Sequence, residues 1–451
     1  MKVEVEKMRK LAFFTYGFII LLLVSVSIAS ADDLNTGDIS WIIAASALVM
    51  LMTPAVGFFY AGLVRRKNLV ATLFQCIAIF AVVSIVWTLW GYSLVFGTSY
   101  KGLIGDLSMF GLRDVGTLPN NDYAPTIPAL LFYFFQLKFA AITPALIIGA
   151  IAERIRFKAL LIFIILWTTI IYFPIAHWVW NINGWLRHFG AIDFAGGTVV
   201  HIAAGVSALA AVLVIGKRKD AGEADFVPNN IPLVVLGAAL LWFGWFGFNG
   251  GSALAANGLA VSALVVTNLA AAAAAVSWMA VDWITRGKPT AVGLTVGAVC
   301  GLVAITPASG YVGVLPSIVI GLIAGIVSNL VANWRASRVA FDDSLDVFAC
   351  HGVSGIWGSL ATGLFATVAV NSTGPNGLFY GNPKQLLIQL LAVVVVGTFA
   401  FVGSYLLLKL IGLVTELRVS PEEEEKGLDR SSHGERAYVG EAGEANDELN
   451  A

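Results

Sequence analysis

Long apolar stretches dominate the sequence and set the strongest limit on its fold. Apolar residues make up 58% of the 451 residues and charged residues only 12%, against about 25% charged in an ordinary soluble domain. A helix needs about 20 apolar residues to cross a bilayer, and only helices or closed barrels satisfy the backbone there. The stretches are too long and too little alternating for barrel strands, so we expect an all-α polytopic membrane protein. Its eleven expected transmembrane helices cover residues 40–63, 70–96, 127–151, 158–180, 194–215, 231–250, 258–282, 290–306, 312–333, 348–370 and 385–413.

Cations in the short connections predict how these helices are oriented. They cluster after the odd-numbered spans, as in Arg-Arg-Lys at 65–67 and Lys-Arg-Lys at 217–219, and are few in the alternate connections. Because cytoplasmic loops carry an excess of Lys and Arg, the odd-numbered spans should end in the cytoplasm. We therefore expect a multi-pass protein of the cell (plasma) membrane with its mature N-terminus outside and its C-terminus cytoplasmic.

The first 31 residues have the pattern of a secretory signal. A charged segment that ends at Lys10 precedes a mostly apolar run over 11–27, and small residues at 29 and 31 fit a cleavage site after Ala31. An uncleaved first span is the alternative, and both place the next residue outside. The expected organisation is a signal peptide at 1–31, a transmembrane domain at 32–414 and a cytoplasmic regulatory tail at 415–451.

Two histidines within apolar spans are the main functional signal, because an ionisable group at that depth is costly. His201 lies eight positions beyond Asp193 on the fifth span, and His351 follows Asp346 on the tenth. If the chain contains two copies of a five-span unit, the odd number of spans means that the second copy is inserted in the opposite orientation. Transporters with such inverted repeats have their substrate path at the interface between the repeats. We therefore expect two inverted five-helix repeats plus one extra C-terminal helix, with both histidines near the membrane midplane.

Small residues share a helical stripe with each histidine. Gly197, His201 and Gly205 lie at four-residue spacing, as do His351 and Gly355. Small residues let helices approach closely, which would bring the two imidazoles together. Packing glycines are common in membrane bundles, but the mirrored occurrence on two helices favours the contact.

A buried histidine pair suits a small polar guest. Burial favours neutral imidazoles, and a neutral pair can share one proton between facing ring nitrogens, which leaves a donor and an acceptor for the guest. A bare charge in such a path faces a penalty of several kcal/mol. The path therefore suits an uncharged or transiently neutral molecule.

Aromatic residues crowd the predicted outer end of the bundle. Ring faces beside a hydroxyl bind a small cation with about 0.5–2 kcal/mol. An aromatic belt at the membrane interface is the alternative, and it explains single tryptophans better than rings well inside a span, such as Phe135 and Phe139. The crowded aromatics are Phe135, Phe139, Trp178, Trp180, Trp245, Phe246 and Phe248.

Other motifs are weaker. Ser252 follows two glycines like a serine nucleophile, but the sequence offers it no neighbouring base. Two buried histidines could ligate haem, but small residues surround them. Cys76, Cys300 and Cys350 lack CxxC spacing and fit small core residues. We expect no enzyme activity, catalytic residue, cofactor, metal site or nucleic-acid partner.

The sequence resembles the Amt/Mep/Rh ammonium transporter family, in its prokaryotic Amt type, over nearly the whole mature chain. The matching stretches are FQLKFAAITPA (135–145), GAIAERIRF (149–157), DFAGGTVVH (193–201), WFGFNGGS (245–252) and DVFACHG (346–352). The resemblance implies eleven helices around one pore per subunit, inverted five-helix repeats and a homotrimer in the lipid bilayer.

The resemblance also implies roles for individual residues. The outer recruitment site would be Phe139, Trp180 and Ser252, and the stacked gate below it Phe139 and Phe248. The pore pair would be His201 and His351, and Asp193 would order the outer vestibule from behind. Regulation by a PII-type signal protein would fall on residues 416–438 of the tail.

One residue departs from the expected pattern. Lys138 lies in the middle of the third span, where we expect a small or apolar residue. Adjacent helix positions differ by about 100°, so its side chain should face away from Phe139. It would then snorkel towards an interface or pair at a subunit contact; in the pore it would repel a cation.

The sequence therefore predicts a transmembrane ammonium transporter or channel. Ammonium is captured outside, loses its proton and passes as NH3 along the histidines, with or without separate proton movement. Two alternatives stay open, namely an ammonium sensor that signals through the tail and a transporter of another small amine or gas.

Overall fold

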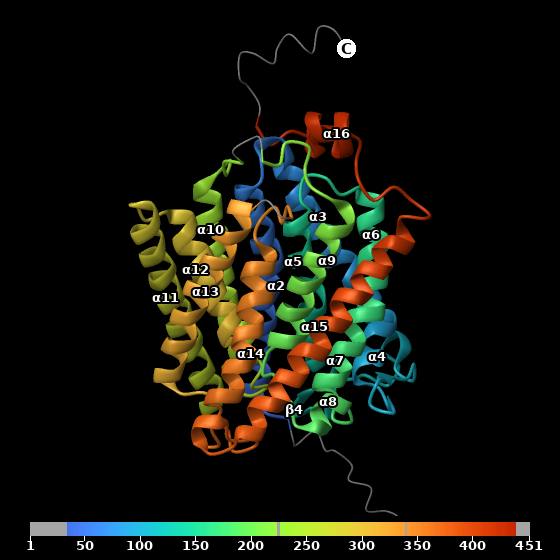
Figure 1. Cartoon of the computed structure of the whole chain (residues 1–451). Coiled ribbons are helices and arrows are strands. Elements are labelled where there is room, and N and C mark those ends of the chain that lie inside the picture. Colours follow the sequence, from blue (N-terminus) through green and yellow to red (C-terminus); the bar gives the residue numbers. More distant parts are fainter. Residues whose placement is uncertain (1–33, 223–225, 339–340, 439–451) are drawn as a thin grey trace, which may run out of the picture.

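The computed structural model of the chain describes residues 34–222, 226–338 and 341–438. These residues form a bundle of helices that run roughly along one direction (Figure 1). Helix α16 (Pro421–Lys426) lies at one end, called here the tail end, and helix α8 (Trp185–Phe189) and strand β4 (Ala124–Pro128) lie at the other, the loop end. The expected signal peptide lies outside the described residues.

Helical segments occupy each of the eleven expected ranges. They are α2 (Thr36–Leu63), α3 (Leu69–Val86) with α4 (Tyr92–Phe96), α5 (Ala129–Ile151), α6 (Phe157–Trp167) with α7 (Phe173–Trp180), α9 (Ala203–Ile215), α10 (Ile231–Trp245), α11 (Gly258–Arg286), α12 (Ala291–Ile305), α13 (Val314–Arg338), α14 (Ser354–Phe365) and α15 (Pro383–Ile411). Within the described residues, nine helices are long and apolar enough to cross a membrane, and α12 is apolar but shorter. The chain is therefore a multi-pass helical membrane protein.

The short strands lie in the long loop between α4 and α5. Strands β1 (Ser99–Tyr100) and β2 (Ile104–Gly105) pair antiparallel, with Ser99 opposite Gly105. Strands β3 (Pro119–Asn120) and β4 pair in the same way, with Asn120 opposite Ala124. These hairpins close the loop end beside α8, and Ala124 and Ile127 of β4 are buried in the hydrophobic core.

Wide π-helical turns interrupt several helices, a feature that the sequence analysis did not predict. The described turns are η3 (Trp87–Gly91), η5 (Thr168–Tyr172), η6 (Gly197–Ile202), η7 (Phe246–Gly250) and η8 (Phe348–Val353). Such turns are rare and concentrate at functional sites. Here they hold His201, Phe248 and His351, so each of these side chains projects from a locally unwound helix.

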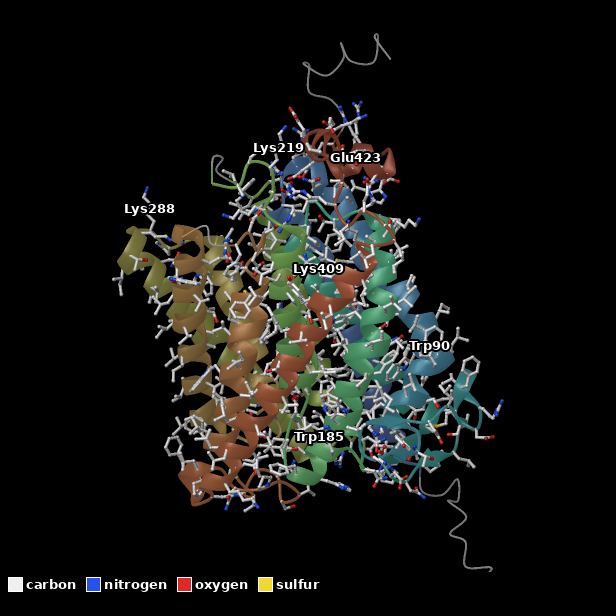
Figure 2. All side chains as sticks on the ribbon, turned by 45° about the vertical axis from the view of Figure 1, so that its right-hand side comes forward. Trp90, Trp185, Lys219, Lys288, Lys409 and Glu423 are labelled. Atoms are coloured by element: carbon white, nitrogen blue, oxygen red, sulfur yellow. The ribbon has the colours of Figure 1, made fainter. Side chains whose placement is uncertain are left out.

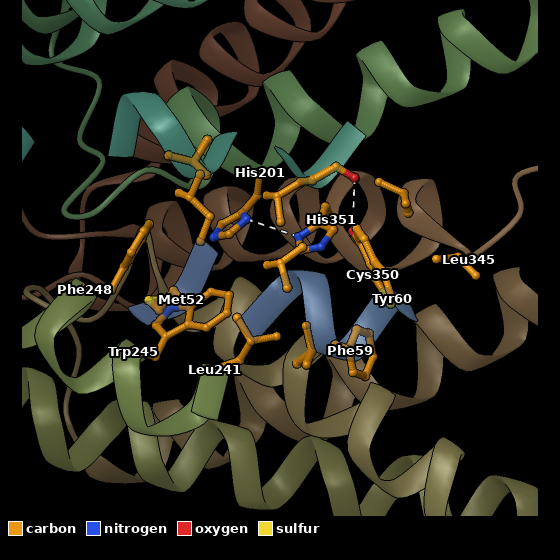
Figure 3. Close-up of a pocket in the computed structure, with 16 residues that line it drawn as sticks. Met52, Phe59, Tyr60, His201, Leu241, Trp245, Phe248, Leu345, Cys350 and His351 are labelled. Atoms are coloured by element: carbon orange, nitrogen blue, oxygen red, sulfur yellow. Dashed lines mark hydrogen bonds between the residues drawn. The ribbon is translucent and has the colours of Figure 1, made fainter. Parts of the chain in front are cut away.

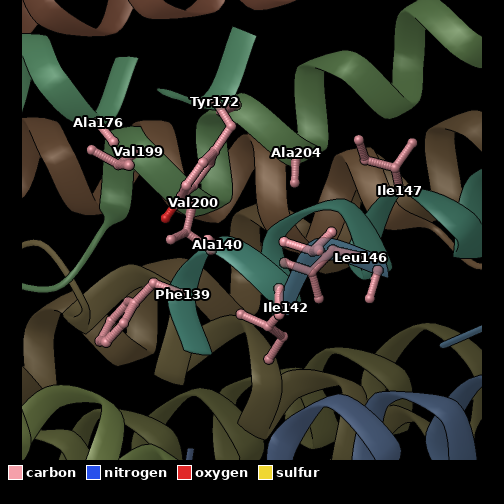
Figure 4. Packing of buried hydrophobic residues seen from close by; sticks show 14 of the residues in the cluster. Phe139, Ala140, Ile142, Leu146, Ile147, Tyr172, Ala176, Val199, Val200 and Ala204 are labelled. Atoms are coloured by element: carbon pink, nitrogen blue, oxygen red, sulfur yellow. The ribbon is translucent and has the colours of Figure 1, made fainter. Parts of the chain in front are cut away.

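The two histidine-bearing helices cross with their backbones almost in contact. A Cβ added at Gly205 would lie 2.1 Å from the Gly352 nitrogen, and one added at Gly355 would lie 3.1 Å from the His201 Cβ. The expected role of the small residues is thereby confirmed for both. Figure 4 shows the apolar packing around this crossing, where Ile142 and Leu146 of α5 belong to the same buried cluster as Val200 and Ala204.

The described part of the tail folds against the tail end of the bundle. In helix α17 (Leu428–His433), Asp429 accepts hydrogen bonds from the backbone N–H groups of Val70 and Ala71 at the start of α3. Glu424 accepts from the Lys219 N–H and is only 2% exposed. Figure 2 shows Lys219 and Glu423 together at this end. Charged tails of this kind are usually solvated or disordered. Here the buried acidic contacts make residues 415–438 part of the fold.

Replacing Gly205 by alanine should destabilise the bundle, because the new methyl group has no space against Gly352. Overpacking of this kind costs about 1–3 kcal/mol, so we expect a lower melting temperature in detergent. Gly397→Ala is the matched control, since its Cβ would meet only an Ile202 methyl at 3.9 Å. Equal melting temperatures for the two variants would contradict a backbone contact at Gly205.

Candidate functional site

Three consecutive cavities lead through the bundle from the loop end to the tail end. The first, with a volume of about 760 Å³, is lined by Asp193, Trp180 and Ser252 among others. The second has a volume of only about 20 Å³ and contains both His201 and His351. The third, of about 820 Å³, opens at the tail end beside charged side chains such as Asp342, Asp346 and Arg218. The wide outer and inner cavities therefore flank a constricted middle.

Two phenyl rings separate the first cavity from the second. Phe139 of α5 lines the outer cavity and Phe248 of η7 lines the narrow one. Their ring centroids lie 4.3 Å apart with planes tilted by 40°, and each residue is 1% exposed. Trp180 meets Phe139 edge-on at 5.8 Å. A guest can pass only if these rings move aside.

The histidines meet inside the narrow cavity (Figure 3). The Nδ1 atoms of His201 and His351 lie 3.3 Å apart, and the rings are nearly parallel, with an angle of 15° between their planes. His201 also stacks on Trp245 at 5.4 Å. Its Nε2 has no hydrogen-bond partner among the described residues. The pair can therefore share one proton at Nδ1 and leaves Nε2 of His201 for a small polar guest.

Asp193 organises the start of the first histidine helix. Its carboxylate accepts hydrogen bonds from the N–H groups of residues 196–199 and from the Thr198 hydroxyl. Its backbone oxygen accepts the Trp180 indole N–H at 3.1 Å. Gly196 has φ +116°, which only glycine adopts easily. Asp193 thus fixes both the turn that carries His201 and an aromatic wall of the outer cavity.

The second histidine helix starts at Asp343, and the pairing of Asp346 with Asp193 in the sequence analysis is wrong. Asp343 accepts hydrogen bonds from the N–H groups of Val347 and Phe348, whereas Asp346 binds the Arg335 side chain at 2.6 Å. Asp343 precedes His351 by eight positions, the same spacing that separates Asp193 from His201. That equal spacing is the signal in the sequence that could have found it.

Ser252 lines the outer cavity, and its hydroxyl proton is already engaged in a hydrogen bond. Its hydroxyl donates to the Phe248 carbonyl oxygen at 2.8 Å, one turn earlier in the chain. The remaining lone pairs of the oxygen can accept hydrogen bonds from a cationic guest. The aromatic rings of Phe139 and Trp180 line the same cavity.

Lys138 lies away from all three cavities. Its Nζ is 3.4 Å from the centre of the Phe134 ring and 5.4 Å from that of Phe80 on α3. It is not among the residues that line the path. The prediction that it faces away from the Phe139 side of α5 is therefore confirmed. Its ammonium rests on aromatic faces, where cation–π attraction partly replaces hydration.

The carboxylates below the histidines titrate very differently. Burial, reinforced by the charge of Asp346, raises the pKa of Asp343 to about 6. Burial alone would also raise the pKa of Asp342, but hydrogen bonds and charge from Arg218 lower it to about 2. Two adjacent acids thus differ by several pKa units because one has a cation and the other only backbone donors.

Within the described residues, no group of three His, Cys, Asp or Glu side chains is arranged to hold a metal ion. The site is instead built from aromatic rings, a hydroxyl and imidazoles. Such groups are able to bind a small polar guest and to exchange a proton with it.

The chain is similar to ammonium transporters over most of its length. The Ammonium Transporter Family matches residues 40–438. The ammonium transporter of Bacillus subtilis is 46% identical over 405 residues, which cover 90% of this chain and 99% of that protein. Ammonium transporter Amt1 of Archaeoglobus fulgidus is 48% identical over 406 residues, with coverages of 90% and 100%. The crystal structure of Saccharomyces cerevisiae Mep2 has a TM-score of 0.80 at 37% identity and covers 87% of this chain and 92% of its own.

Asp343→Asn should flatten the dependence of stability on pH. The folded protein holds the Asp343 proton more tightly than the unfolded chain, so stability is lost as pH rises from about 4 to about 6. An asparagine does not titrate. We expect the variant to gain up to about 3 kcal/mol relative to the wild type across this window, measured by unfolding at pH 4.5 to 7. A constant difference between the two proteins over this pH range would contradict the raised pKa.

Proposed function

Because the chain belongs to the ammonium transporter family and is a membrane ammonium transporter, we propose that it conducts the nitrogen as NH3 through the narrow cavity. The observation that carries this proposal is the histidine pair, which lies in an apolar constriction directly behind an outer cavity suited to a cation. A guest that must change from charged to neutral explains why the two environments follow each other.

In the outer cavity, NH4⁺ would lie between the faces of Phe139 and Trp180 and donate one hydrogen bond to the Ser252 oxygen. The cation–π contacts contribute about 0.5–2 kcal/mol, and more as water is lost. Asp193 acts from behind: its carboxylate oxygens hold the helix start, and its backbone holds Trp180. It sets the shape of the recruitment site without needing to bind the guest.

Passage of the phenyl gate favours the neutral form. Behind Phe139 and Phe248, the side chains that line the narrow cavity are mostly apolar, and the Leu146 and Thr306 oxygens beside it already accept hydrogen bonds from Tyr60 and Trp245. A bare cation would therefore lose its hydration without replacement, at a cost of several kcal/mol. NH3 needs only an acceptor for its N–H groups and a donor for its lone pair, which the histidine pair supplies.

The arrangement in the membrane is part of the same proposal. All eleven helical ranges cross the bilayer as two inverted five-helix repeats plus α15, residues 1–31 are a signal peptide, and the tail end is cytoplasmic at the plasma membrane. The cation-rich connections at the tail end support this orientation. By the family resemblance, three copies associate as a homotrimer.

The tail is the proposed regulatory element, and a PII-type signal protein is its proposed partner. Asp429 attaches it to the start of α3, and Glu424 attaches it to the loop that follows α9. One solved structure with 33% identity and a TM-score of 0.81, which covers 88% of this chain and 98% of its own, is named "Sensor Amt Protein". For this chain the transport function is favoured over sensing alone.

Replacing both His201 and His351 by leucine should change ammonium flux, its selectivity over K⁺, or both. The substitution removes the polar nitrogens of the narrow cavity and keeps it apolar. Currents for ammonium, methylammonium and K⁺ in proteoliposomes measure the effect. Flux and selectivity identical to the wild type would refute the proposed role of the pair.

Asp429→Ala should release the tail from the start of α3, because it removes the acceptor of two backbone hydrogen bonds. If the tail regulates transport, ammonium flux or the binding of a PII-type protein changes while the melting temperature of the bundle falls little. Glu435→Ala is the control, since Glu435 lies in the same segment and is exposed. Identical flux and binding in all three proteins would remove the tail from regulation.

A further inference from the structure

Two cysteine side chains meet beside the histidine pair. Cys300 of α12 donates its S–H to the Cys350 sulfur of η8, with the two Sγ atoms 3.5 Å apart. Cys350 lines the narrow cavity and directly precedes His351 (Figure 3). Cys300 is fully buried behind it. Two thiols in contact therefore lie beside the path at its narrowest part, and Cys350 is the one that faces the cavity.

The third cysteine provides an internal comparison. Cys76 of α3 packs against Gly57 of α2, where an added Cβ would lie 3.3 Å from the Cys76 Cβ. It is fully buried and lines none of the three cavities. Burial is thus similar for all three thiols, and access from the cavity distinguishes Cys350.

We propose that Cys300 and Cys350 form an oxidisable dithiol beside the conduction path and that its oxidant is a small neutral peroxide. The inference rests on the proposed function, because a path that passes neutral NH3 also admits a neutral molecule such as hydrogen peroxide. Bulky oxidants are excluded by the phenyl gate and by the burial of both sulfurs, since Cys350 is 4% exposed and Cys300 0%.

The chemistry follows from the positions of the two sulfurs. The Cys350 sulfur attacks one peroxide oxygen, the O–O bond breaks, and one water leaves together with the thiol proton, which gives a sulfenic acid. The Cys300 sulfur then attacks the Cys350 sulfur, and the second water leaves as the disulfide forms. In sum, two thiols lose two electrons and two protons, and one hydrogen peroxide becomes two waters. Cys350 is the attacking thiol because it lines the narrow cavity, whereas Cys300 lies behind it.

The disulfide would displace the turn that carries Cys350 and His351 in the pore. A disulfide holds its sulfurs about 2.05 Å apart, so the two atoms must approach by about 1.5 Å from their separation of 3.5 Å. Cys350 then moves towards α12 and carries the turn that holds His351. Because His351 is the neighbouring residue and faces His201 at 3.3 Å, the spacing of the imidazoles changes and the path is obstructed.

The first test measures the bond itself. The full-length protein in proteoliposomes is treated with hydrogen peroxide, and peptides are mapped by mass spectrometry without reduction. We expect a Cys300–Cys350 cross-link with Cys76 still a free thiol, and no cross-link after treatment with oxidised glutathione, which is too large to enter. A peroxide-treated protein without the cross-link, or with Cys76 oxidised equally, would overturn the proposal.

The second test measures transport. Peroxide should lower ammonium flux by up to about a hundredfold, the scale on which displacements of about 1 Å affect positioned groups, and dithiothreitol should restore it. Cys300→Ala should transport normally and lose this inhibition, because no resolving thiol remains. Inhibition that persists in the variant would contradict a disulfide mechanism.

The two tests also separate this inference from the proposed function. If untreated protein carries no ammonium, the proposed function fails whatever the cross-linking result. If untreated protein transports ammonium but the cross-link does not form, the dithiol proposal alone fails.

Discussion

The close crossing of the two histidine helices is the constraint on which the rest of the site depends. At Gly205 the backbone of α9 lies against the backbone of Gly352, with no space for even a methyl group. This contact brings two imidazoles from opposite helices to 3.3 Å. It also requires each helix to begin inside the bundle, where its first N–H groups cannot reach water. The N–H groups at each helix start therefore need a hydrogen-bond acceptor from the protein itself, and a carboxylate is that acceptor in both helices.

The two carboxylates that cap these helices, Asp193 and Asp343, differ in how well hydrogen bonds compensate the burial of their charge. This difference distinguishes the loop end of the path from the tail end. Asp193 accepts five hydrogen bonds, which offset much of the cost of burying its charge. Asp343 accepts two and lies near a second acid, so its pKa rises to about 6. A buried carboxyl that titrates near neutrality makes the tail end the more pH-sensitive half.

Much of this arrangement could be predicted from the sequence, because burial and crossing leave strong local signals. Apolar runs located the helical ranges, and the glycines near His201 and His351 predicted the contact. The wide turns could not be predicted, since they depend on how a helix packs along its length and not on its apolar pattern. The choice between Asp343 and Asp346 depended on Arg335, which is remote in sequence and removes Asp346 from the cap. Lys138 was placed on the correct side by helix geometry alone, but its aromatic partners are tertiary.

The order of the three cavities along the path accounts for the proposed selectivity for ammonium over K⁺ better than any single residue does. Charged side chains line the wide cavity at the tail end, and aromatic rings with a hydroxyl line the one at the loop end. Between them, mostly apolar side chains line the narrow cavity and offer a cation few oxygen acceptors. K⁺ would need several oxygen ligands in place of its water and cannot become neutral. Under the proposed mechanism, ammonium sheds a proton and then requires only the imidazole nitrogens, so the constriction that would stop K⁺ would let NH3 pass.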